Sequence, residues 1–247
     1  MAGVEITNLT KQYLVAGEEF YALKDVSTVI PDGSFTVIVG RSGCGKTTLL
    51  RLLGNLEEKS AGRIRLGDGG SKAGGRRIGM VFQEHRLMPW LSVKENMAFS
   101  CTRQEQRDRT ERLVAKYLRV LGLEKFQDAY PAQLSGGMAQ RVALGRTLCY
   151  DPDIILMDEP FGALDYFTRQ RLQREIVDLF LAQKKTIVFV THDVTEAVYL
   201  GQKIIVMDAG EVVRELPVDL PYLRDPASPE FLAVQREILS SLRGDQT

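Results

Sequence analysis

The sequence predicts an α/β fold with a helix-covered parallel sheet, an N-terminal antiparallel β layer and an inserted helical subdomain. Short β-branched runs that are apolar on both faces indicate covered parallel strands. These runs are Thr36–Val39, Ile154–Met157, Thr186–Val190 and Lys203–Met207. Alternating stretches in the first third, such as VEITNL, are typical of an antiparallel layer. Between about Arg86 and Tyr150 the strand-like runs stop, and we place the helical insertion there.

Helical periodicity supports this insertion. The run RDRTERLVAKYLRVLGL has one apolar helical face, and Gly122 is its expected stop. The residues on that face are Leu113, Tyr117, Leu118 and Leu121. The glycine-rich segment 67–75 predicts a turn or a flexible loop, and residues 228–242 predict an amphipathic helix.

We therefore predict a single domain, 1–247, in three parts. They are an α/β core (1–85 and 151–216), a helical subdomain (86–150) and a C-terminal helical tail (217–247).

The composition limits the function classes. Lys plus Arg and Asp plus Glu both number 32, and this balance argues against a nucleic-acid binder with a broad basic face. No apolar run approaches the ~18 residues of a membrane span, and the N-terminus lacks the features of a secretion signal. Cys44, Cys101 and Cys149 have neither metal-site nor disulfide-framework spacing. We expect a cytosolic protein whose membrane role depends on a partner.

The segment GRSGCGKT, Gly40–Thr47, matches a phosphate loop. It follows a predicted strand and precedes a predicted helix, which is the context that this motif requires. Lys46 would supply charge to the β- and γ-phosphates, and the Thr47 hydroxyl would bind Mg²⁺. The expected nucleotide-binding residues are Gly40, Arg41, Ser42, Gly43, Cys44, Gly45, Lys46, Thr47 and Thr48.

Two carboxylates end the apolar strand in IILMDEP. Asp158 would lie at the carboxyl edge of the sheet, near Mg²⁺, and Glu159 could polarise the attacking water. In isolation, a solvated turn is the alternative for such a pair. Beside a phosphate loop we favour the catalytic interpretation.

Gln83 and His192 also follow predicted strands. The Gln83 amide could bind Mg²⁺ or the attacking water, although an ordinary polar loop residue is an equal alternative. A lone histidine is more often structural, but its strand-end position favours a functional role for His192.

The segment LSGGMAQR combines a capping serine with two glycines at a predicted helix start. Paired glycines weaken a first helical turn by roughly 1 kcal/mol each relative to alanine. With Ser135 as the cap, Gly136 and Gly137 leave first-turn N–H groups uncovered, as in an anion site. The chain thus has a second candidate phosphate site.

Together these motifs resemble the ATP-binding subunit of ABC transporters, over about Val4 to Leu216. They are the phosphate loop, Gln83, LSGGMAQR, IILMDEP, GALD (Gly162–Asp165) and His192, and LSGG is the specific element. The resemblance implies a P-loop NTPase (RecA-like) core, an ATPase that uses ATP and Mg²⁺, and a head-to-tail homodimer. ATP would lie between the phosphate loop of one copy and the LSGG helix of the other.

The resemblance also implies roles for single residues. Tyr13 would stack on adenine, although Phe20 and Tyr21 are alternative platforms by chemistry. His192 would contact the γ-phosphate, Glu159 would be the general base, and Asp165 would link the two subunits.

A closer resemblance is to importer subunits for nitrate, aliphatic sulfonates and taurine. It is carried by His85–Phe99, Tyr130–Leu144 and Asp158–Asp165. It implies an ATPase subunit at the cytoplasmic face of the membrane, bound to permease subunits and served indirectly by a substrate-binding protein. The alternatives are a non-transport ABC ATPase acting on nucleic acid or ribosomes, and an exporter subunit. The neutral charge and the lack of a long heptad run argue against the first, and the loop with Pro89 and Trp90 favours import over export.

In this importer family the segment after the glutamine receives a coupling helix. The candidate docking residues are Leu87, Met88 and Trp90, because methionine and aromatic side chains favour interfaces. The alternative is that they only pack the helical insertion.

We make two further predictions, one for Gly145 and one for Cys44. Gly145 stands where the family more often has alanine, which questions the stability of that helix. Cys44 would lie against the nucleotide, so we expect its alkylation to block hydrolysis and ATP to protect it.

Overall fold

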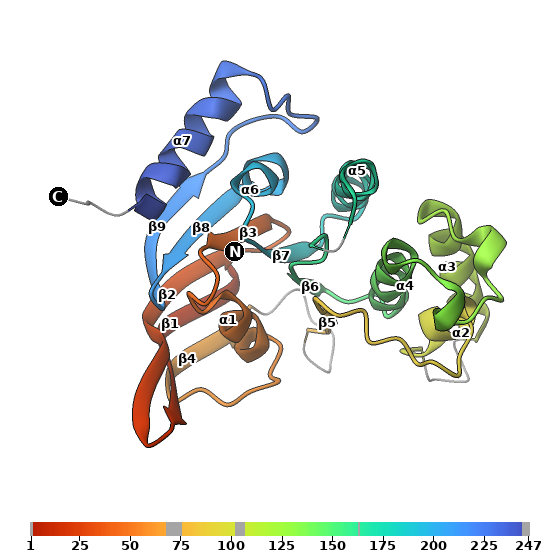
Figure 1. The fold of residues 1–247 in the computed structure, drawn as a ribbon, viewed down its shortest axis with the longest axis horizontal. Helices are drawn as coiled ribbons and strands as arrows, with labels where there is room; N and C mark the ends of the chain where they lie inside the picture. Colours follow the sequence, from red (N-terminus) through yellow and green to blue (C-terminus); the bar gives the residue numbers. More distant parts are fainter. Residues whose placement is uncertain (1, 68–75, 102–106, 163, 244–247) are drawn as a thin grey trace. The chain divides into compact units, whose positions relative to one another are not determined.

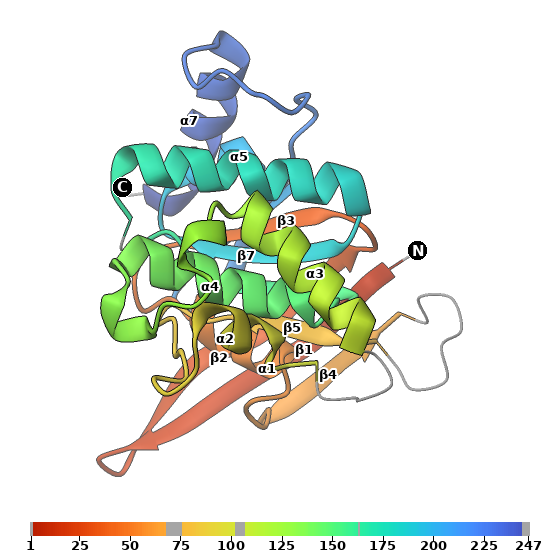
Figure 2. The same cartoon turned by 90° about the vertical axis from the view of Figure 1, so that its right-hand side faces the viewer.

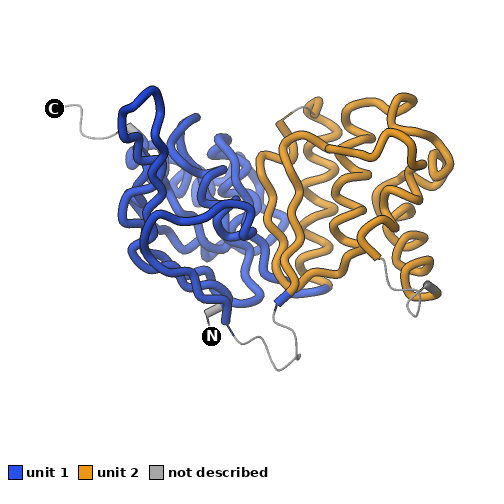
Figure 3. Tube along the Cα trace, turned by 90° about the horizontal axis from the view of Figure 1, so that it is seen from below, with its two compact units in different colours: residues 1–76, 183–247 blue, residues 77–182 orange. Residues whose placement is uncertain are grey.

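The computed structural model describes residues 2–67, 76–101, 107–162 and 164–243. The chain forms two compact units, which Figure 3 distinguishes. Unit 1 comprises Met1–Arg76 and Gln183–Thr247, and unit 2 comprises Arg77–Ala182. The turn predicted at residues 67–75 lies, apart from Gly67, outside the described residues. In the part of the chain that the structure describes, no helix is long and apolar enough to cross a membrane.

The antiparallel layer predicted at the N-terminus is present in unit 1. Its central strand β1 (Ala2–Val15) pairs with β2 (Glu18–Pro31) and with β4 (Ala61–Leu66). Ala16 and Gly17 connect β1 to β2 with φ of 53° and 88°. Two central residues with positive φ are typical of a tight hairpin turn that matches strand twist.

The parallel strands of unit 1 are buried on both faces, as predicted. Strand β3 (Phe35–Gly40) lies between β7 (Thr186–Thr191) and β8 (Lys203–Asp208), parallel to both (Figure 1). Strand β9 (Glu211–Pro217) adds antiparallel to β8. Every residue of β3 and β7 is buried.

The described residues of unit 1 form three α-helices. They are α1 (Lys46–Leu53), α6 (Val194–Leu200) and α7 (Pro229–Arg243). Helix α6 packs on β3, and α7 packs on α6 and β8. Phe231 and Ile238 of α7 are fully buried, which agrees with the amphipathic pattern predicted for residues 228–242.

Unit 2 contains one parallel strand pair and four α-helices among its described residues. Strand β5 (Ile78–Val81) pairs with β6 (Ile154–Asp158). The helices are α2 (Val93–Ala98), α3 (Arg107–Val120), α4 (Gly136–Cys149) and α5 (Tyr166–Gln183). Two short 3₁₀ turns, η2 (Glu124–Phe126) and η3 (Pro131–Gln133), lie between α3 and α4. Since β5, β6 and α5 group with the insertion, unit 2 is larger than the predicted subdomain 86–150.

Helices α2, α3 and α4 pack against one another, as Figure 2 shows. Tyr117, Leu118 and Leu121 are buried as predicted, whereas Leu113 is only half-buried and Val114 completes the apolar face. Gly122 ends this segment with φ of 63°. The predicted helical insertion is therefore correct in kind, and its buried face differs at one position, where Val114 takes the place of Leu113.

The structure explains Gly145 by close packing. A Cβ atom built on Gly145 would lie 2.6 Å from Met97 Cε and 3.0 Å from Leu121 Cδ1. Met97 and Leu121 are both fully buried. The intrinsic cost of a mid-helix glycine, about 1 kcal/mol, is therefore offset by the approach of α2 to α4.

We predict that Met97 and Gly145 are energetically coupled. Met97→Ala should cost about 2–5 kcal/mol of unfolding free energy. In that background Gly145→Ala should regain about 1 kcal/mol, because helix propensity improves and the methyl group enters vacated space. In the wild-type background the same change should gain less or destabilise. Urea denaturation of the four proteins measures the coupling, and equal effects of Gly145→Ala in both backgrounds would contradict it.

Candidate functional site

The phosphate loop of unit 1 joins the end of β3 to the start of α1. Gly43 and Gly45 have φ of 80° and 101°, a region that favours glycine. A Cβ atom on Gly45 would lie 2.3 Å from the Ala22 carbonyl oxygen of β2, and one on Gly40 would lie 2.2 Å from the Met207 carbonyl oxygen of β8. Only glycine fits these two positions without moving backbone.

Lys46 is held inside this loop. Its side chain is 4% exposed, and Nζ donates to the carbonyl oxygens of Gly40 at 2.8 Å and Arg41 at 2.9 Å. An ammonium group has three N–H donors, so this arrangement retains donor capacity for a phosphate oxygen. Thr47 follows in the first turn of α1 and is half-buried.

The first turn of α1 is suited to an anion. Its N-cap is Gly45, with no side-chain cap, and no acidic residue lies in the turn. The N–H groups of a first turn lack helical acceptors and carry the positive end of the helix dipole. The loop and helix start therefore form a backbone site for phosphate.

His192 lies at the same sheet edge as the phosphate loop. Thr191, the last residue of β7, pairs with Val39 of β3. Gly40, which ends β3, and His192, which follows β7, therefore lie at the ends of neighbouring strands. Asp193 caps α6 by accepting from the N–H groups of Thr195 at 2.8 Å and Glu196 at 3.2 Å. The residue after His192 is thus fixed, while the His192 side chain itself is exposed.

The hairpin of β1 and β2 separates the three aromatic candidates for adenine. Tyr13 is half-buried, donates through its hydroxyl to Glu57, and has the Lys11 ammonium 4.7 Å from its ring centre. Burial and the Glu57 hydrogen bond raise the pKa of Tyr13. Phe20 lies directly opposite Tyr13 in register, whereas Tyr21 lies opposite the preceding residue and so on the other face.

The Cys44 thiol is less accessible than its loop position suggests. Its side chain is buried, and Sγ would lie 2.7 Å from a Cβ atom on Gly40. Burial raises the pKa of Cys44, although the Lys46 charge partly opposes this. Because the thiolate is the reactive form, both properties slow alkylation. The expected modification should therefore be slow.

The two carboxylates at the end of β6 differ in burial and in backbone conformation. Asp158 ends β6 and is 4% exposed, whereas Glu159 is half-buried and has φ of 42°. Gln83 follows β5, whose Val81 pairs with Met157 of β6. The β5–β6 pair thus places Gln83, Asp158 and Glu159 at one carboxyl edge, as predicted for parallel strands.

The first turn of α4 is open. Ser135 Oγ accepts from the Met138 N–H at 3.3 Å, which is the predicted N-cap. A Cβ atom on Gly136 would meet nothing within 4 Å, whereas one on Gly137 would lie 3.2 Å from Leu164 Cδ2. Ser135 and Gly136 are exposed, and the first turn contains no acidic residue. This turn can therefore accept an anion from outside the unit.

Asp165 directly precedes α5 in the same unit. Its Oδ1 accepts from the Thr168 N–H at 3.1 Å, and hydrogen bonds from Thr168 lower the pKa of the Asp165 carboxyl. The carboxylate is exposed and charged at neutral pH.

The candidate docking residues form part of an ordered loop. Trp90 is 69% exposed, whereas Leu87 and Met88 are half-buried. The alternative that Trp90 packs the helical insertion is not supported by this exposure. Two residues that the sequence analysis missed, Asn96 and Arg146, hold the loop through its backbone. Their bonds reach main-chain atoms, so no side-chain pattern could have identified them.

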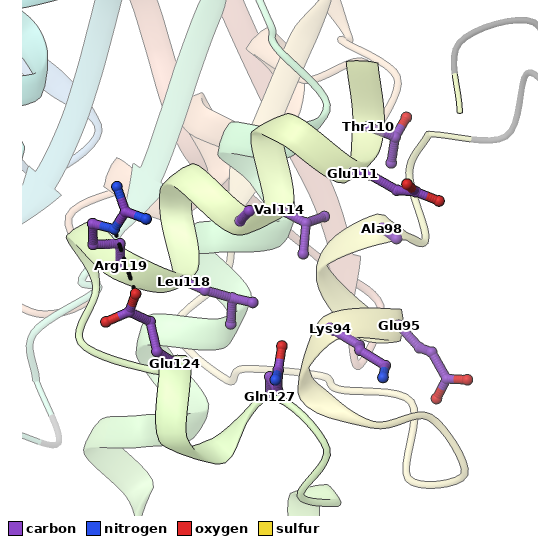
Figure 4. Close-up of a pocket in the computed structure, with 11 residues that line it drawn as sticks. Lys94, Glu95, Ala98, Thr110, Glu111, Val114, Leu118, Arg119, Glu124 and Gln127 are labelled. Atoms are coloured by element: carbon purple, nitrogen blue, oxygen red, sulfur yellow. Dashed lines mark hydrogen bonds and ion pairs between the residues drawn. The ribbon is translucent and has the colours of Figure 1, made fainter. Parts of the chain in front are cut away.

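A cavity of about 580 Å³ also lies in unit 2, between α2, α3 and η2 (Figure 4). Its lining includes Ala98, Val114 and Leu118, and Arg119 pairs with Glu124 at its edge, 3.4 Å apart. None of the residues predicted for nucleotide or docking lines it.

Comparisons with known proteins identify the family. The ABC transporter family model matches residues 23–162. An ABC transporter ATP-binding protein of Methanocaldococcus jannaschii is 42% identical, over 98% of this chain and 92% of the relative. An aliphatic sulfonates import ATP-binding protein of Bacillus licheniformis is 41% identical, over 91% of this chain and 88% of the relative. Its Bacillus subtilis counterpart is 37% identical, over 96% and 93%.

Solved structures agree with the fold. A dimeric ATP-binding cassette in a post-hydrolysis state, bound to ADP and phosphate, has a TM-score of 0.77 and 34% identity. The match covers 88% of this chain and all of that one. The predicted P-loop NTPase fold and ATPase activity are thereby confirmed. The chain belongs to the ATP-binding subunits of the ABC transporter family.

Proposed function

We propose that this ATPase powers the import of a small solute of the nitrate, sulfonate and taurine class through partner membrane subunits. The observation that carries the proposal is a second open helix start with no acidic residue, at the first turn of α4, in a chain that already has a complete phosphate loop. Relatives named as aliphatic sulfonate importers support the solute class. The net charge of zero offers no basis for a nucleic-acid partner.

ATP with Mg²⁺ is the proposed cofactor pair. The donor set fits Mg²⁺, because the Thr47 hydroxyl, the Asp158 carboxylate and the Gln83 amide all offer oxygen. Bound Mg²⁺ would neutralise charge on the β- and γ-phosphates. Lys46 would bind those phosphates and His192 the γ-phosphate, while Glu159 would accept a proton from the attacking water.

Adenine would lie against Tyr13. The half-buried ring is fixed by Glu57 through its hydroxyl, so little side-chain freedom is lost on stacking. Phe20 shares the face of Tyr13 and is the better placed of the two alternatives, because Tyr21 lies on the opposite face.

The proposed active form is a head-to-tail homodimer. Ser135, Gly136 and Gly137 of one copy would bind the γ-phosphate held by Lys46 of the other, and Asp165 would contact the partner. Similar solved cassettes are dimeric, which supports this arrangement. Dimer closure would then depend on ATP, since the nucleotide supplies the anion.

The membrane partner would bind at the loop that carries Leu87, Met88 and Trp90. An exposed tryptophan on an ordered loop is a suitable anchor for an apolar helix. The chain would thus be peripheral at the cytoplasmic face, and a separate substrate-binding protein would select the solute.

Co-purification from membranes tests the import assignment. The tagged chain should retain a polytopic membrane protein and no nucleic acid, and Trp90→Ala should lose that protein without losing ATPase activity. Retention of RNA or DNA in place of a membrane protein would favour the non-transport alternative.

Glu159→Gln should nearly abolish turnover while allowing an ATP-bound dimer to accumulate, because the amide cannot accept the proton. Phosphate release and light scattering with MgATP measure the two effects. Glu84→Gln, an exposed acid in the loop after β5, is the matched control and should hydrolyse normally. Normal turnover in Glu159→Gln would show that Glu159 is not the general base.

Ser135→Arg should spare ATP binding yet abolish dimerisation and hydrolysis, because a long side chain would fill the open turn of α4. The control is Ala132→Arg, which adds the same charge at an exposed position three residues earlier. ATP affinity, dimer fraction and hydrolysis rate are measured for both. Full hydrolysis by Ser135→Arg would show that the turn is not a nucleotide contact.

A further inference from the structure

The loop of residues 85–92, which we call the docking loop, is organised around one buried amide. Asn96 of α2 is fully buried. Its Oδ1 accepts from the Met88 N–H at 2.8 Å. Its Nδ2 donates to the carbonyl oxygens of Met88 at 3.1 Å, Leu91 at 2.9 Å and Ser92 at 3.1 Å. The oxygen and the NH₂ group of this amide are thus both hydrogen-bonded within one short segment, which specifies a single loop conformation.

A second side chain holds the beginning of the loop. Arg146, in the last turn of α4, donates through its two terminal nitrogens to the carbonyl oxygens of Arg86 at 2.9 Å and His85 at 3.1 Å. The planar guanidinium fork matches two consecutive carbonyls, which a lysine ammonium cannot reproduce. The docking loop is therefore attached directly to α4.

The far end of the loop is fixed to α2. Ser92 and Glu95 form a reciprocal capping box that starts this helix directly after the loop. Helix α2 in turn packs on α4 where Met97 meets Gly145. The loop is therefore connected to α4 twice, through Arg146 and through α2, and between these attachments Trp90 faces solvent.

Helix α4 joins this attachment to the candidate anion site. Gly136 begins the helix, and Arg146 lies ten residues further along it, or about 15 Å at 1.5 Å per residue. A displacement of the first turn would displace Arg146, because the hydrogen-bonded helix between them is stiff. Both ends of this path lie in unit 2.

We propose that Arg146 and Asn96 are positioning residues that fix the docking loop to α4, so that ATP bound at the first turn of this helix moves the surface that Trp90 presents to the membrane subunit. The inference rests on the proposed function for its partner and for its nucleotide. The attachment itself can be tested without either one.

The first experiment measures hydrogen exchange of residues 84–91 in the isolated chain. Arg146→Met keeps the apolar stem and removes the donors, and it should accelerate exchange at least tenfold. Arg146→Lys should do the same, because the fork is lost. The matched control is Arg141→Met on the same helix, which removes bonds to the Leu121 carbonyl at 2.9 Å and the Gly137 carbonyl at 3.4 Å and should leave exchange of residues 84–91 unchanged. Equal acceleration by Arg141→Met, or none by Arg146→Met, would overturn the assignment.

Asn96 is tested in the same way with Asn96→Asp, which keeps the acceptor for the Met88 N–H and loses the donors. Exchange should again rise in residues 84–91, and time-resolved anisotropy of Trp90, the single tryptophan, should report added local motion. Unchanged exchange and anisotropy would remove Asn96 from the proposal. If Asn96→Asp does not fold, the Arg146 series still decides the attachment of the loop.

The second experiment tests transmission. In the Glu159→Gln background, MgATP should alter exchange of residues 84–91, and adding Arg146→Met should abolish this change while ATP affinity stays within twofold. Persistence of the ATP effect in Arg146→Met, or its absence in the Glu159→Gln parent, would refute transmission through Arg146. Failure to co-purify a membrane protein would instead refute the import function and leave the exchange result standing, so the two failures are distinguishable.

Discussion

The hydrogen bonds from the Lys46 ammonium to two carbonyls of its own loop set the geometry of the phosphate loop in unit 1. A buried ammonium is costly unless it is hydrogen-bonded, so the loop must keep those carbonyls converged. That convergence needs the left-handed backbone of Gly43 and Gly45. Since Gly45 lies against β2 and Gly40 against β8, the antiparallel layer and the parallel strands both hold one short loop.

Helix α4 has a comparable role in unit 2. Gly136, Gly137 and Gly145 together lower its intrinsic stability by a few kcal/mol, at roughly 1 kcal/mol per glycine. Contacts with α2 and α3 must therefore hold the helix, as is usual for helices in proteins. Gly136 leaves the first turn open, and Gly145 lets α2 come close to the last turn. A helix that depends on its neighbours in this way is well suited to move with them.

The sequence was sufficient to place residues at a strand end or a helix start. Lys46, Asp158 and Ser135 could be located because strand, loop and helix patterns have fixed periods. Asn96 and Arg146 could not, because they bond main-chain carbonyls whose positions depend on tertiary structure. Burial of Cys44 was missed for a related reason, since the packing of a loop against β3 leaves no periodic signal.

The backbone of Glu159 has an unfavourable conformation, and the segment after it reaches the first turn of α4. Its φ of 42° is unfavourable for a residue with a side chain and costs about 1 to 3 kcal/mol, which neighbouring contacts must offset. The Gly162 N–H donates to the Glu159 carbonyl oxygen at 3.2 Å, and the Leu164 N–H donates to the Phe161 carbonyl oxygen at 3.1 Å. Leu164 then packs beside Gly137 in the first turn of α4. The segment that follows the proposed base therefore also contacts the first turn of α4, through Leu164.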